Sequence, residues 1–73
     1  MDREYDSFDE YDLFERFTDG SVVWRVYVRG IQNAVAKPKE LGSLSTNEHF
    51  AIHTPTKAVV ARVNAVLADE LSI

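Results

Sequence analysis

The sequence predicts an α+β domain: a small antiparallel sheet, in the order strand–strand–helix–strand–strand, with one helix packed on one face. Three observations predict this class. Asp19-Gly20 lies between two strand-like runs, as in a hairpin. Apolar residues recur from Ile31 at three- and four-residue spacing, as on one face of a helix. Residues 58–63 are rich in β-branched valine, which favours a strand.

The charges divide this chain of 73 residues unevenly. The net charge is −4, and residues 1–10 alone hold five acids and one arginine, so the remainder is balanced. We therefore predict an acidic, disordered tail over 1–10, one domain over 11–64 and a C-terminal tail over 65–73. Folding of so short a chain buries only about 60% of the surface that the unfolded chain exposes, which predicts low stability.

The first hairpin is the clearest local signal. Asp-Gly favours a two-residue turn, so we expect Thr18 to face Ser21 across it. Alternation along both strands then gives one apolar face with Glu15 as its only acid. That face comprises Tyr11, Leu13, Phe17, Val22, Trp24, Val26 and Val28. The opposite, more polar face comprises Asp12, Phe14, Arg16, Val23, Arg25, Tyr27 and Arg29.

A helix is predicted to start near Ile31, with Gly30 at its entry and Gly42 at its end. Pro38 is unfavourable in its middle, because proline lacks the backbone N–H and its ring clashes with the preceding turn. The helix is therefore expected either to kink at Pro38 or to stop by Lys37.

Residues 49–53 alternate weakly and predict a third strand, but residues 54–73 allow two interpretations. Thr54 and Pro55 can begin a helix, which gives three strands and a second, C-terminal helix. Alternatively, 54–57 form a hairpin loop that leads into a fourth strand. We favour the fourth strand. Its register predicts the pairs His53–Ala58, Ile52–Val59, Phe50–Ala61 and Glu48–Val63. It places Phe50 and Ile52 on the apolar face, and His49, His53 and Arg62 on the other.

Known catalytic patterns are absent from the sequence. The three glycines are too dispersed for a phosphate-binding loop, and there is no HExxH motif. On a strand, His49 and His53 lie about 13 Å apart, too far to bind one metal together. We expect neither cofactor nor metal and no enzymatic activity, since a core this small leaves little room for a pocket of about 300 Å³.

One polar sheet face is the candidate binding surface, and it comprises Phe14, Arg16, Arg25, Tyr27 and Arg29. The sequence favours a small non-catalytic module that binds another protein or itself through a sheet edge, this face or the segment around Phe8. The alternative is a nucleic-acid-associated regulator that uses the Arg25/Tyr27/Arg29 stripe. The acidic net charge disfavours that alternative, because it repels phosphates.

Two further expectations concern Glu15 and location. Glu15 either accepts a hydrogen bond from the indole N–H of Trp24 or is kept wet at the sheet edge, and we favour the wet edge. A secretory signal and a long apolar stretch are both missing, and the chain has no cysteine. We therefore expect a cytoplasmic protein with no membrane partner.

Overall fold

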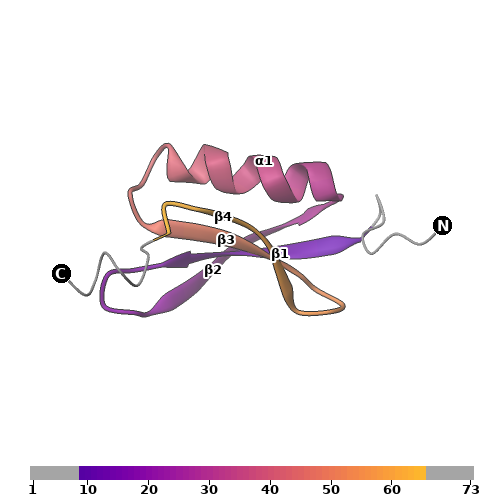
Figure 1. Ribbon diagram of the computed structural model, residues 1–73, viewed down its shortest axis with the longest axis horizontal. Coiled ribbons are helices and arrows are strands. Elements are labelled where there is room, and N and C mark those ends of the chain that lie inside the picture. The colour runs from indigo at the N-terminus through magenta and orange to yellow at the C-terminus, as the bar shows by residue number, and fades with distance from the viewer. Residues whose placement is uncertain (1–8, 66–73) are drawn as a thin grey trace.

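The computed structural model describes residues 9–65 of the chain. The elements are β1 (Glu10–Arg16), β2 (Val22–Arg29), α1 (Ile31–Gly42), β3 (Glu48–His53) and β4 (Ala58–Val63). The four strands form one antiparallel sheet in the order β2-β1-β3-β4. α1 lies across one face of the sheet, mainly over β3 and β4 (Figure 1).

This architecture confirms the predicted α+β class. The alternative with a C-terminal helix starting at Thr54 is wrong, because Ala58–Val63 is a strand. Asp9 and Glu10 belong to the folded region, since the carbonyl of Asp9 accepts a hydrogen bond from the N–H of Gly30 at 2.8 Å. The rest of the predicted tails, 1–8 and 66–73, lies outside the described residues, as does Phe8.

The core lies between α1 and the central strands. Tyr11 and Leu13 of β1, Ala34 of α1 and Ala51 of β3 are fully buried there, and Ala61 of β4 packs against them. Alanine side chains are small, so α1 can approach β3 and β4 closely. The bulkier Tyr11 and Leu13 fill the space over β1.

α1 has the predicted bounds and continues through Pro38. Gly30 precedes the helix with φ of 90°, a left-handed conformation that favours glycine. Pro38 removes the N–H that would bond the carbonyl four residues earlier. Its ring is fully buried against the sheet, however, and this burial offsets part of the cost. The expectation that the helix stops by Lys37 is wrong.

The first hairpin closes with a three-residue loop, 18–20. The N–H of Phe17 donates to the carbonyl of Ser21 at 2.8 Å, and the N–H of Gly20 donates to the carbonyl of Phe17 at 2.9 Å. Gly20 has φ of 92°. This is a type I turn followed by a left-handed glycine, a common hairpin loop. The predicted two-residue turn is therefore wrong by one residue.

A bulge at Arg25 then restores the predicted register. The pairs Leu13–Val26 and Tyr11–Val28 are confirmed, and the register shifts on the turn side of Leu13. A bulge places two residues of one strand opposite one residue of the other, so every side chain between it and the turn changes face.

The side chains that change face are Val22, Val23 and Trp24. Trp24 pairs with Phe14, so Trp24 and Val22 lie on the face away from α1, and Val23 pairs with Glu15 on the helix side. All three were predicted on the opposite faces. The single tryptophan of the chain therefore lies outside the expected core, and it is 52% exposed.

The second hairpin has the predicted connection, but the side chains of β3 face opposite to the prediction, whereas Arg62 of β4 lies on the predicted face. His53–Ala58 and Ile52–Val59 pair as predicted, and a register shift beyond Ile52 makes the pairs Phe50–Ala61 and Glu48–Val63 wrong. His49 and His53 are buried on the helix side, each 2% exposed. Phe50 and Ile52 face away from α1, because they pair with Phe14 and Asp12 of β1.

Candidate functional site

The sheet face that points away from α1 is the principal candidate site, and we call it the open face. α1 is the only helix among residues 9–65, and it lies on the other side of the sheet (Figure 1). By register, the apolar side chains of the open face come from all four strands. They are Phe14, Val22, Trp24, Tyr27, Phe50, Ile52 and Val59.

Aromatic contacts organise the centre of the open face. The rings of Phe14 and Phe50 stack with their centroids 5.5 Å apart, and the guanidinium of Arg16 lies over Phe50 at 5.2 Å. These neighbours leave Phe50 only 5% exposed. Trp24 and Tyr27 are each 52% exposed, so two large rings remain available for contact.

Charged side chains lie at the two ends of the open face, and the ends differ in sign. At one end, which we call the basic end, Nε of Arg16 donates to Glu48 at 3.1 Å, and Nε of Arg62 forms an ion pair with the same carboxylate at 3.0 Å, so these three side chains carry a net charge of +1.

The opposite end of the open face is acidic. Arg29 pairs with Glu10 at 3.3 Å, and Asp12 accepts a hydrogen bond from the indole N–H of Trp24 at 3.2 Å. Glu10, Asp12 and Arg29 together carry a net charge of −1, and we call this the acidic end. Asp12, and not Glu15, therefore accepts the hydrogen bond from the Trp24 indole.

Four of the five predicted binding residues lie on the open face, and one does not. Phe14, Arg16, Tyr27 and Arg29 lie on it, as their strand pairings show. Arg25 is the bulge residue, and its Nε donates to the buried Glu15 at 2.8 Å. The predicted Arg25/Tyr27/Arg29 stripe is therefore divided between the two faces of the sheet.

The sequence interpretation missed Trp24 and Phe50 as members of this face, and it placed Arg62 there without counting it among the binding residues. Trp24 was misassigned because Asp19-Gly20 also fits a three-residue loop, and only that alternative turns the indole outward. Phe50 and Arg62 were placed on different faces because the bulge in the second hairpin has no sequence marker. The positions of the two bulges decide which face each of these side chains occupies, and strand alternation alone does not reveal those positions.

A buried polar network lies on the helix side of the sheet, around Glu15. Its carboxylate accepts hydrogen bonds from Asn47 at 2.7 Å, Arg25 at 2.8 Å and Ser45 at 3.1 Å. These donors, Asn47 first, lower the pKa of Glu15 from its ordinary 4.5 to about 2, although burial acts in the opposite direction. The expectation of a wet Glu15 is wrong, since the residue is 4% exposed.

His53 ties three segments together on the same side. Its Nε2 lies 2.7 Å from the carboxylate of Asp9, and its Nδ1 lies 2.7 Å from the hydroxyl of Thr56. A carboxylate only accepts, so Nε2 carries a proton. These bonds fasten the start of β1 to the β3–β4 loop. His49 differs, because its buried Nδ1 has no hydrogen-bond partner within residues 9–65.

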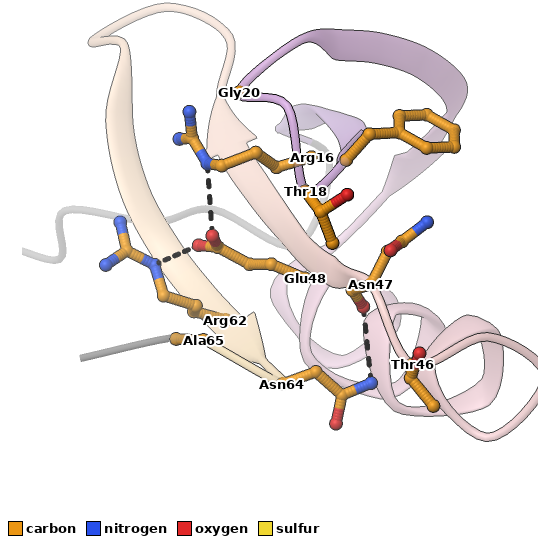
Figure 2. A pocket seen from close by; sticks show the side chains of 10 residues that line it. Arg16, Thr18, Gly20, Thr46, Asn47, Glu48, Arg62, Asn64 and Ala65 are labelled. Carbon is orange, nitrogen blue, oxygen red and sulfur yellow. Dashed lines mark hydrogen bonds and ion pairs between the residues drawn. The ribbon is translucent and has the colours of Figure 1, made fainter. Parts of the chain in front are cut away.

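A pocket of about 510 Å³ lies at the basic end of the sheet. Figure 2 shows Arg16, Glu48 and Arg62 along one wall, with Asn47 to the right of Glu48 and Asn64 below. The expectation that the chain has little room for a pocket above 300 Å³ is therefore wrong. The pocket is formed outside the core, between the first hairpin loop and the ends of β3 and β4.

Comparison of the chain with protein-family models, with curated proteins and with solved structures finds no match. Within residues 9–65, no helix has the length and apolar character to cross a membrane. The same residues contain no group of three or more metal-ligating side chains.

Proposed function

We propose that this chain is a non-catalytic self-association module, and that a second copy docks open face against open face. One observation carries the proposal: the open face has two aromatic rings that are half exposed, Trp24 and Tyr27, on the strand beside the stacked Phe14–Phe50 pair. Exposed contiguous apolar surface on a small domain is typical of interaction sites. Tryptophan and tyrosine contribute strongly when they are buried in interfaces.

The charge pattern of the open face favours a second copy as the occupant. Phe14 lies between Asp12 and Arg16 on the same face of β1. Consider a two-fold axis that passes Phe14, lies in the plane of the interface and runs perpendicular to β1. It would place the acidic end of one copy over the basic end of the other. Such an interface is self-complementary, as a two-fold interface between identical chains must be.

The size of the face predicts weak association. Four strands of about seven residues cover roughly 19 by 23 Å, or about 440 Å² for each copy. Interfaces that bury less than about 1,200 Å² in total are typically transient. We therefore expect a dimer that forms reversibly and with a strong dependence on protein concentration.

The nucleic-acid alternative has less support. Arg25 is engaged with Glu15, and Arg29 with Glu10, so the stripe offers one aromatic ring between two paired arginines. Retention on a heparin column that added salt abolishes would favour this alternative and would count against the self-association module.

Sedimentation equilibrium over a wide range of concentrations tests the proposal. The wild-type chain should shift from monomer toward dimer mass as the concentration rises. Trp24→Ser should weaken the association constant by at least tenfold, because it removes the largest exposed ring of the interface.

Val35→Ser is the matched comparison, because Val35 is an exposed apolar residue of α1, away from the open face. This variant should associate like the wild type. A monomer at every concentration, or equal weakening by Trp24→Ser and Val35→Ser, would overturn the proposal.

A further inference from the structure

We propose that the pocket at the basic end of the sheet binds a small oxyanion, a phosphate or carboxylate group. Its charged lining residues are Arg16, Arg62 and Glu48, which give it a net charge of +1 in a chain whose net charge is −4. Its volume of about 510 Å³ lies within the range of small-molecule sites.

The two arginines are held in place and still have donors to offer. Each uses Nε for Glu48, at 3.1 Å from Arg16 and 3.0 Å from Arg62, and Glu48 itself has a side chain that is only 11% exposed. Arg16 is fixed further by the ring of Phe50. The guanidinium fork has five N–H donors, so the terminal nitrogens can bind a second oxyanion beside Glu48.

The opposite side of the pocket supplies neutral donors. Thr18 and Gly20 come from the first hairpin loop, and Thr46 comes from the loop before β3 (Figure 2). The hydroxyls of Thr18 and Thr46 suit phosphate and carboxylate oxygens, whereas the N–H of Gly20 already donates to the carbonyl of Phe17. Charge from the arginines and neutral donors opposite them together favour one oxyanion group on a small molecule.

Asn64 fixes the floor of the pocket. Its side-chain amide donates to the carbonyls of Gly42 at 3.2 Å, Ser45 at 3.1 Å and Asn47 at 3.3 Å. These bonds join the end of β4 to the end of α1 and the following loop. The site therefore stands between anchored elements, which lowers the entropic cost of binding.

A nuclear magnetic resonance titration tests this site. Inorganic phosphate and acetate are added separately, with sodium chloride at matched ionic strength as the reference. We expect saturable shifts of the backbone amides of Thr18, Gly20 and Asn47 with at least one oxyanion and none with chloride. Low protein concentration keeps the chain monomeric, so this test and the test of self-association can fail separately.

Three variants test whether the oxyanion binds at this pocket. Arg62→Gln should weaken binding about tenfold, because it removes one charge-assisted donor. Glu48→Gln should tighten binding several-fold, because it removes the competing carboxylate. Arg29→Gln removes an arginine at the far end of the sheet and should leave binding unchanged.

Unsaturable shifts, equal shifts with chloride, or an unchanged midpoint in Arg62→Gln would overturn the anion site. The remaining amide resonances of each variant report whether it is folded. Arg16→Gln replaces Arg62→Gln if the latter fails to fold, with the same expected loss.

Discussion

Each face of the sheet departs from the usual division into an apolar core and a polar surface, and the two faces depart from it in different ways. The covered face, under α1, buries Glu15, His49 and His53 among its apolar residues. The open face exposes Trp24 and Tyr27. Hydrogen bonds satisfy most of these buried ionisable groups, whereas half of the surface of each exposed ring remains in water, although the indole N–H of Trp24 donates to Asp12. This contrast indicates that the covered face holds the fold together and that the open face is available for association.

The largest expected effect compares one residue type on the two faces. Tyr11 is fully buried on the covered face, and Tyr27 is half exposed on the open face. Tyr11→Ala should lower the free energy of unfolding by about 3 kcal/mol or more. Since domains of this size are stable by roughly 5 kcal/mol, the variant should be close to unfolded.

Tyr27→Ala is the counterpart and should cost less than about 1 kcal/mol in the monomer. Urea unfolding followed by circular dichroism measures both variants. Equal losses would show that the open face contributes to the fold as much as the covered face does, and would break the contrast.

The sequence was sufficient to predict the fold class, the approximate bounds of the helix and strands, and about half of the strand pairs in each hairpin. Gly30 and Gly42 delimit the helix, and the pairs Leu13–Val26 and His53–Ala58 follow from strand alternation. These features depend on local conformational preference, which a single sequence contains.

The errors in facing have two physical causes. Each hairpin has a register shift, and a shift of one residue exchanges the faces of the side chains beyond it. Apolarity suggested that Phe50 and Ile52 face the helix, but α1 packs closely on Ala51, so the larger side chains point outward. Packing between elements distant in sequence decides such a choice, and strand alternation does not contain it. The binding surface was therefore predicted with Phe14 and Tyr27 but without Trp24.

The second prediction concerns the acid sensitivity of the covered face. The pKa of Glu15 is lowered in the folded state to about 2. Its ionised form therefore stabilises the fold fully above pH 4.5, and this contribution is lost as the pH falls toward 2. The urea midpoint of the wild type should decrease over that window.

Glu15→Gln should lower the midpoint at neutral pH and flatten its decrease in acid. Asp19 provides the comparison, since Ser21 also lowers the pKa of this exposed turn residue. Asp19→Asn should retain most of the wild-type slope. If Glu15→Gln retained that slope as well, the network around Glu15 would not be the source of the acid sensitivity.

The smallest effect is expected at the acidic end of the open face. Arg29 and Glu10 pair at 3.3 Å, and both side chains are at least half exposed. Exposed ion pairs contribute little, so Arg29→Gln should change the free energy of unfolding by less than about 0.5 kcal/mol. A larger loss in urea unfolding would mean that this end of the open face supports the fold itself.

Paramagnetic relaxation between copies tests most directly whether the open face binds a second copy. The sequence contains no cysteine, so Thr18→Cys places a single spin label beside the basic end. The labelled chain is mixed with unlabelled, ¹⁵N-enriched wild type at a concentration where the dimer forms. Docking of open face on open face predicts selective broadening of the amides of Glu10 and Thr54, at the opposite end of the sheet. Broadening centred on the exposed side of α1, at Gln32 and Val35, would contradict it.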